Sequence, residues 1–299
     1  MAKPIQILLQ TTIPTNEDDW HIGRFSLLKN FLTSLKSSTG EPLYQVTARD
    51  RESPAGEDDR ILTTLADSDF DELWLFAVDI GDGITPQECE SISAFRQRGG
   101  GLLVTRDHQD LGCCVCNLAG VGAAHYFQSQ NPEPDSSRHC LDDIYTKSIS
   151  WPNYHSGLNG NYSKITPLEP IHDLFKYPTL PAQEIQFFPS HPHEGAVGVP
   201  ANEQNARVIA EGTSLITGRT FNLVVAFEHT KDEQGNILGR AIAESSFHHF
   251  ADYNWDVDMG APSFVSEPPG DGMKQNPQAL EDIKVYVQNV ALWLAPSSI

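Results

Sequence analysis

A capped helix followed directly by a buried strand, in the region 85–105, restricts the fold of this chain more than any other feature. Thr85 suits an N-cap, Pro86 the first helical position and Glu88 the third, which together form a capping box. Gly99 predicts the end of the helix, and the apolar run that follows it predicts a strand. A capped helix between apolar segments is typical of a β-α-β unit, whose strands are parallel.

The same alternation extends along most of the chain. Strands are predicted at 5–10, 44–48, 73–78, 102–105, 207–210, 221–227 and 240–243, and helices at 25–35, 60–66, 85–98 and 276–294. The strands at 221–227 and 240–243 flank a turn-like segment, 231–236, and are predicted to form a hairpin. We therefore expect one α/β domain over residues 1–299, with a mostly parallel sheet and helices on both faces.

Residues 109–200 break this rhythm. They are rich in Pro, Asn, Ser, Gly and His and show little periodicity. Loops of that length are uncommon unless they are functional or disordered, and the aromatic residues here favour order. We expect a long inserted cap that lies over the ligand-binding edge of the sheet.

Charge and hydropathy exclude several classes of function. The 299 residues contain 20 Lys and Arg against 40 Asp and Glu, a formal net charge of -20. Such a surface disfavours nucleic acid and anionic membranes as partners. The apolar N-terminal run 5–9 is too short for a signal peptide, so we expect a cytoplasmic protein. We expect its partner to be a small-molecule substrate. A homo-oligomeric state stays open.

The five cysteines suggest free thiols, because the count is odd and no secretory signal accompanies it. Three of them fall in Cys113-Cys-Val-Cys116, which is not a Cys-x-x-Cys redox motif. Small buried residues in a tight loop are the favoured interpretation, and metal ligation is the alternative.

Two predicted strands end in groups that carry chemistry. The strand at 240–243 runs out into His248, His249 and Asp252, and the strand at 102–105 into Asp107 and His108. Ligands of open α/β sheets bind beyond the carboxyl ends of the strands. His108 and one of His248 and His249 are therefore predicted as general base and acid or as metal ligands, with Asp107 or Asp252 orienting an imidazole. Only one of the two adjacent histidines is expected to face the crevice, because alternate residues of a strand point to opposite faces.

The same groups suggest a metal site as a second hypothesis. His108, His248, His249 and Asp252 could bind a divalent metal such as zinc, iron, nickel or manganese. Their spacing does not match His-Glu-x-x-His, and a metal-free site is the alternative.

Substrate contacts are predicted from two further clusters of polar residues, at 18–24 and 191–194, and from one aromatic residue. Arg24 would begin the first helix, where it could meet an anionic group, and Trp255 could stack on a ring. The predicted substrate-binding residues are His21, Arg24, His191, His193, Glu194 and Trp255. A polar turn with surface histidines is the alternative interpretation of the segment 191–194.

The segment Arg98-Gly-Gly-Gly-Leu-Leu-Val-Thr-Arg-Asp-His108 resembles the trehalose-utilisation (ThuA-like) branch of the class I glutamine amidotransferase-like superfamily. Gly218-Arg-Thr-Phe and Gly239-Arg-Ala-Ile, the second leading into Phe247-His-His, are similar to that family's Gly-Arg strand. The resemblance covers residues 1–108 and 206–295. It implies a flavodoxin-like sheet with a functional residue in the turn after the strand at 102–105.

The chain departs from the superfamily's glutaminases at this turn, where they carry a cysteine nucleophile. Cys113 and Cys114 come several residues too late. We therefore expect an enzyme that is not a glutaminase. It would act on a small polar substrate, with a carbohydrate-related one as an option, by acid/base or metal-assisted hydrolysis. The rival hypothesis is a non-catalytic ligand-binding or scaffolding domain.

Overall fold

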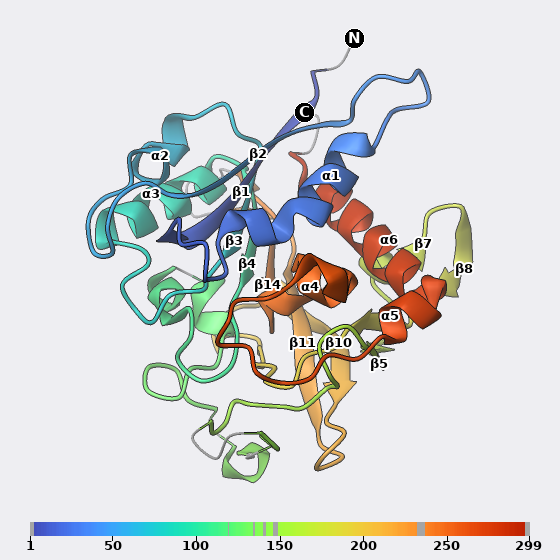
Figure 1. The fold of residues 1–299 in the computed structure, drawn as a ribbon. Coiled ribbons are helices and arrows are strands. Elements are labelled where there is room, and N and C mark those ends of the chain that lie inside the picture. Colours follow the sequence, from blue (N-terminus) through green and yellow to red (C-terminus); the bar gives the residue numbers. More distant parts are fainter. Residues whose placement is uncertain are drawn as a thin grey trace.

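The fold is built on an eight-stranded, mostly parallel sheet (Figure 1). The computed structural model describes residues 3–118, 120–133, 135–139, 142–145, 149–231 and 237–296. The strand order is β2-β1-β3-β4-β14-β11-β10-β6. Its strands are β1 (Ile5–Pro14), β2 (Tyr44–Arg51), β3 (Glu72–Phe76), β4 (Gly101–Thr105), β6 (Thr166–Pro167), β10 (Ala206–Thr213), β11 (Thr220–Phe227) and β14 (Ala241–Glu244).

The parallel half of the sheet comprises β2, β1, β3, β4 and β14. The other three strands pair antiparallel, beginning with the predicted hairpin between β11 and β14. Residues 232–236, in the predicted turn, lie outside the described residues. The α/β class with a mostly parallel, flavodoxin-like sheet is confirmed.

Helices cover both faces of the sheet, as Figure 1 shows. The helices are α1 (Ser26–Ser34), α2 (Arg60–Thr63), α3 (Pro86–Gln97), α4 (Asp252–Trp255), α5 (Gly272–Gln275) and α6 (Pro277–Leu294). Leu28 of α1 and Ile283 of α6 belong to one apolar core, whereas Leu62 of α2 and Ile92 of α3 belong to the core on the opposite face. Among the described residues, no helix combines the length and apolar character needed to cross a bilayer.

The predicted ends of α3 are confirmed. The Thr85 hydroxyl accepts from the Glu88 backbone N–H at 3.2 Å, and the Glu88 carboxylate accepts from the Thr85 N–H at 2.8 Å. Gly99 has φ 95°, in the left-handed region that favours glycine after a helix. The helix is thus followed directly by β4.

The segment 109–200 contains more regular structure than the sequence predicts. β6 extends the main sheet, and two small antiparallel sheets pair β5 (Tyr162–Lys164) with β9 (Phe187–Pro189) and β7 (Lys176–Tyr177) with β8 (Leu180–Glu184). These strands are two to five residues long, too short to give a period-2 pattern. The chain emerges from β9 directly into His191 and His193.

Candidate metal centre at the ends of β4 and β14

The candidate site begins where β4 and β14 end side by side. The two strands pair in parallel, with Val104 opposite Ala243. Asp107 follows β4, and His248 lies in the short 3-10 turn Phe247–His249 that follows β14. The Ser246 hydroxyl donates to Asp107 Oδ1 at 3.3 Å and also accepts from the backbone N–H of His248. The neighbouring strand ends therefore hold the carboxylate and the imidazole together.

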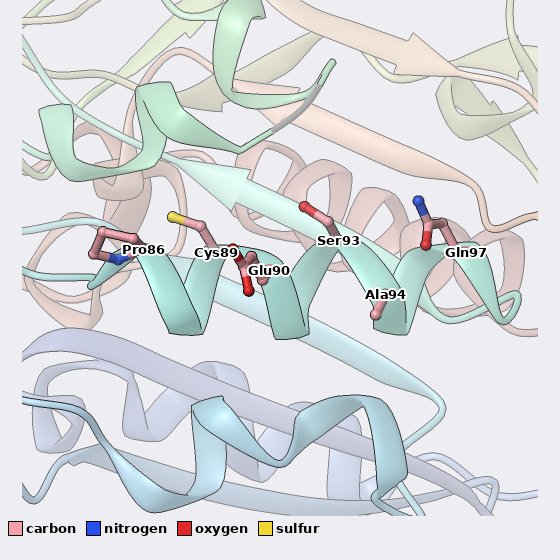
Figure 2. Close-up of a pocket in the computed structure, with 6 residues that line it drawn as sticks. All are labelled: Pro86, Cys89, Glu90, Ser93, Ala94 and Gln97. Carbon is pink, nitrogen blue, oxygen red and sulfur yellow. The ribbon is translucent and has the colours of Figure 1, made fainter.

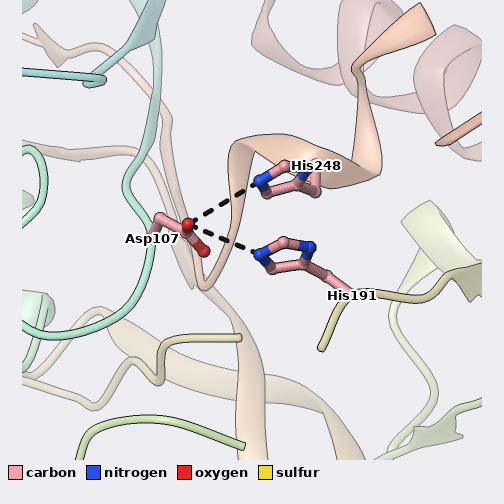
Figure 3. Close-up of side chains that lie close together, drawn as sticks. All are labelled: Asp107, His191 and His248. Atoms are coloured by element: carbon pink, nitrogen blue, oxygen red, sulfur yellow. Dashed lines mark ion pairs between the residues drawn. The ribbon is translucent and has the colours of Figure 1, made fainter. Parts of the chain in front are cut away.

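His191, from the segment after β9, completes a group of three buried side chains (Figure 3). Asp107 Oδ2 lies 3.5 Å from His191 Nε2 and 3.7 Å from His248 Nε2. The imidazole rings of His191 and His248 stack, with centroids 3.5 Å apart. One candidate ligand atom from each of the three residues lies within 4.8 Å of the other two.

Two asparagines fix the tautomers of these histidines. Asn254 Nδ2 donates to the carbonyl of Ser190 at 2.8 Å, so Asn254 Oδ1 is the atom that faces His248 Nδ1 at 3.0 Å. Asn254 Nδ2 also donates to Asn159 Oδ1, and that oxygen accepts from His191 Nδ1 at 2.9 Å. An amide oxygen only accepts, so both Nδ1 atoms carry the proton. In the neutral rings each Nε2 lone pair is thus directed toward Asp107.

Burial and neighbouring charge set the protonation of the group. Burial lowers the pKa of His191 well below its ordinary value, and repulsion from His248 acts in the same direction. Burial would raise the pKa of Asp107, but the imidazoles of His191 and His108 outweigh it and hold the pKa well below the ordinary value. Asp107 is therefore ionised, which is the form that ligates metals. The burial that lowers the pKa of His191 favours loss of the proton that a metal would displace from its Nε2.

The three ligand atoms could hold a divalent ion. Bond lengths of about 2.0–2.1 Å to nitrogen and oxygen in a tetrahedral site put neighbouring ligand atoms about 3.3 Å apart. The separations of 3.5 and 3.7 Å approach that value. Two imidazoles and one carboxylate are the ligand set of several catalytic zinc and iron sites, which keep further positions open. His191 Nε2 is buried with no hydrogen-bond partner, so its lone pair is free for an ion.

The three residues line a cleft of about 430 Å³. His108 and His193 also line this cleft, with ring centroids 5.3 Å apart. His108 Nδ1 lies 3.0 Å from Asp107 Oδ2, and His193 Nε2 lies 2.8 Å from Glu267 Oε1. The hydrogen bond from His193 lowers the pKa of Glu267. Each of the two imidazoles is thus oriented by a carboxylate, as proton-transfer groups require.

A second hollow, of about 540 Å³, lies along one face of α3 (Figure 2). Its lining offers one carboxylate, Glu90, and the thiol of Cys89, whose pKa burial raises to about 11 with help from the charge of Glu88. No histidine lines it among the described residues. The cleft at the strand ends is therefore the better candidate for a reactive site.

The predicted ligand set differs from the observed group. Of the four residues predicted to bind a metal, only His248 belongs to it, and Asp107 and His191 take the other places. His108 contacts Asp107 from the cleft side.

His249 points away from the cleft, into the interior, and Glu194 lies there with it. Its Nδ1 and Nε2 atoms lie 2.9 Å from Glu244 Oε2 and Glu194 Oε1 respectively. Burial would lower the pKa of His249, but attraction to Glu194 and the hydrogen bonds that the ring donates to both carboxylates raise it to about 10. A protonated imidazole with both nitrogens occupied has no lone pair for a metal. Glu194 also accepts from the Ser245 hydroxyl at 3.0 Å.

Asp252 binds the N-terminus of α1. Its carboxylate accepts from the backbone N–H groups of Ser26 and Leu27 and from the Ser26 hydroxyl. Negative charge at a helix N-terminus is favourable, so this placement stabilises the helix. The Asp252 carboxylate is therefore engaged at the start of α1 and does not belong to the group of Asp107, His191 and His248.

Of the remaining predicted substrate contacts, His21, Arg24 and Trp255 are not among the residues that line the cleft. Arg24 donates to the carbonyls of Glu17, Asp19 and Gly260, which leaves little of its guanidinium for an anion. His21 accepts from the N–H of Gly23, and Trp255 is buried and donates to the carbonyl of His249. His191 and His193 do line the cleft.

The cysteines after β4 are poorly suited to nucleophilic attack. Burial raises the pKa of Cys113 to about 11, and burial together with Asp79 raises that of Cys114 further. Cys114 donates to Asp79 Oδ2 at 2.8 Å. Neither thiol is among the described residues that line the cleft.

Sequence reasoning assigned no role to Asn159, Asn254, Glu267 or Trp20. The Trp20 ring packs edge-on against His248, with centroids 4.7 Å apart. Asn254 lies within the segment that carries His248, which was the one available signal. Asn159 and Glu267 lie in irregular segments, where no periodicity shows which way a side chain points.

Comparisons with known proteins concern the fold. No family model matches the chain, and no curated protein matches it. Among solved structures, the chain is similar to the mmIFT52 N-terminal domain at 14% identity and TM-score 0.50, over 98% of this chain and 99% of that one. A ThuA-like protein from Parabacteroides merdae matches at 16% identity and TM-score 0.48, over 99% and 93%.

The glutaminase domain of Trypanosoma brucei CTPS matches at 11% identity and TM-score 0.42, over 98% of both chains. The likeness to the mmIFT52 N-terminal domain, at TM-score 0.50, is one of fold alone. At these identities no activity follows from the neighbours, so function has to be argued from the site.

Proposed function

We propose that this protein is a metal-dependent hydrolase of a small molecule, with Asp107, His191 and His248 as the ligands. The observation that carries the proposal is the convergence of two imidazole lone pairs and one carboxylate oxygen, with both tautomers fixed by Asn254 and Asn159. Lone pairs and negative charge gathered in a buried place need a cation. Fixed tautomers supported by neighbouring hydrogen bonds are the usual surroundings of metal-binding histidines.

The residues around the ion would have distinct roles. A divalent ion at this position would polarise a carbonyl-type group and ease the deprotonation of water. His108, held by Asp107, and His193, held by Glu267, would move protons to and from the reacting group. The cleft volume of about 430 Å³ suits a small molecule. A carbohydrate-related substrate, the option drawn from the fold resemblance, has no separate support in the cleft.

The test is turnover by protein that has been stripped with a chelator and reloaded separately with zinc, iron, nickel or manganese. Against a panel of small esters and amides, we expect activity to return with at least one metal. His193→Gln should lower kcat by about 10²–10⁴-fold while the metal content stays unchanged, because proton transfer and not metal binding is lost. His172→Gln is the matched control, since His172 is buried and bonded to Glu228 outside the cleft.

Equal turnover before and after chelation would contradict the proposal. Uptake of one metal with no turnover of any substrate would instead favour the non-catalytic, ligand-binding role.

A further inference from the structure

Apolar side chains make up much of the wall of the metal-site cleft. Besides the histidines and carboxylates, the lining includes Trp20, Val78, Ile80, Leu111, Ile149, Phe264 and Val265. Two of them are largely open to solvent, since Ile80 is 86% exposed and Phe264 is 59% exposed. Exposed apolar groups rimmed by polar residues commonly mark binding surfaces.

Ile80 and Phe264 reach the cleft from two different loops. Ile80 lies between β3 and α3, and Phe264 lies between α4 and α5. Neither side chain belongs to the apolar cores under the sheet faces. Their exposed area contributes little to folding, whereas a ligand in the cleft would remove it from water.

The acidic side chains that line the cleft have no basic Lys or Arg partner among its described lining residues. Asp19, Asp107 and Glu267 line it, and among the described lining residues none is Lys or Arg. Arg24, which lies near Asp19, is bound to three backbone carbonyls. The whole chain carries a net charge of -20, which adds to the repulsion of an anion.

We propose that the substrate is an uncharged or cationic amphipathic molecule, whose polar reacting group meets the Asp107-His191-His248 group while an apolar, ring-sized group packs on Ile80 and Phe264. The polar half of this inference rests on the proposed function. The apolar half rests on the cleft wall alone. The inference therefore differs from the expectation of a small polar substrate drawn from the sequence, because the proposed substrate has an apolar end.

The test compares two metal-chelating probes, acetohydroxamate and benzohydroxamate, by calorimetry on the metal-loaded protein. The two share the chelating group and differ in the apolar part. We expect benzohydroxamate to bind at least about 10-fold more tightly, because each added apolar group in such a pocket is worth about that factor or more. The double variant Ile80→Ala with Phe264→Ala should remove this preference and leave acetohydroxamate binding unchanged.

Charge is tested with 4-carboxybenzohydroxamate against its methyl ester. We expect the carboxylate to bind several-fold more weakly than the ester. Ile216→Ala is the matched control for the apolar wall, because Ile216 is 46% exposed but lies outside the cleft. It should leave all four affinities as they are in the wild type.

The outcomes separate this inference from the proposed function. Metal uptake with equal affinities for the two hydroxamates, or tighter binding of the carboxylate, would overturn the inference and leave the metal site standing. Failure to take up metal would overturn the proposed function. The same probe pair is then measured by ligand-observed NMR on the metal-free protein. A binding signal of benzohydroxamate that is lost in the double variant would support binding at the apolar wall. Equal binding signals for the two probes would overturn the inference.

Discussion

Asp107 Oδ2 is the atom on which the site depends, because His108, His191 and His248 all approach it within 3.7 Å. Three imidazoles around one carboxylate oxygen could arrange their protons in several ways. Asn254 and Asn159 select one of them by accepting from the two Nδ1 atoms. Whether the group binds an ion or only protons therefore depends on residues that do not touch the cleft.

Asn254→Ala should lower metal affinity by about 10–100-fold, because the tautomer of His248 is no longer fixed. It should also cost about 1–3 kcal/mol of stability, since it leaves the Ser190 carbonyl without its partner. Asn289→Ala is the control, because Asn289 is a buried amide that donates to the carbonyls of Leu174 and Lys176, away from the site. Equal metal affinity in the two variants, measured by competition with a chromogenic chelator, would refute the positioning role of Asn254.

The cysteines should not react as a glutaminase nucleophile does. The thiols of Cys113 and Cys114 have raised pKa values, so the thiolate is scarce at neutral pH. Incubation with a glutamine-analogue electrophile at pH 7, followed by peptide mass spectrometry, should leave both unmodified. Rapid stoichiometric labelling of either one would show that the loop can present a nucleophile.

At the scale of elements, Asp59 joins the start of α2 to β2. Its carboxylate accepts from the N–H groups of Ile61 and Leu62 at the start of the helix and pairs with Arg49 of β2 at 2.8 Å. Burial would raise its pKa, but the hydrogen bond from Arg49 and the backbone N–H groups lower it to about 2. A carboxyl group whose pKa is depressed in the folded state stabilises the fold above its unfolded pKa.

Asp59→Asn should therefore cost about 2 kcal/mol at pH 7, because the stabilisation that depends on the carboxylate charge is lost. The difference between wild type and variant should shrink as the pH falls from about 4 to about 2, because the wild-type carboxylate then takes up its proton. Urea unfolding at a series of pH values measures this. A difference that is the same at pH 3 and pH 7 would show that the ion pair and cap contribute nothing through charge.

Elements with strong local signals could be predicted, and sites built by distant contacts could not. The capping box of α3 and the apolar run of β4 place Asp107 and His108 at the sheet edge from local sequence alone. The position of His191 depends on how the segment 109–200 folds back, which no local pattern encodes. His249 next to His248 shows the same limit, since the 3-10 turn sends the two neighbours in different directions.

At the scale of the whole molecule, the parallel half of the sheet supplies Asp107 and His248 and the segment after β9 supplies His191. An ion bound by all three would tie that segment to the sheet. Metal at about 100 times its Kd should stabilise the folded chain by about 2.7 kcal/mol. The melting temperature should rise by about 5 °C or more. A melting temperature unchanged by zinc, iron, nickel and manganese would argue against an ion that links the two parts.

The most direct test of the central claim is the metal content and metal position of protein purified without an affinity tag. Elemental analysis should find close to one divalent metal per chain, and an anomalous difference map should place it between Asp107, His191 and His248. His248→Ala should lose it, whereas His172→Gln, outside the cleft, should keep it. Metal-free protein that binds none on reloading, or an anomalous peak elsewhere in the molecule, would contradict the account.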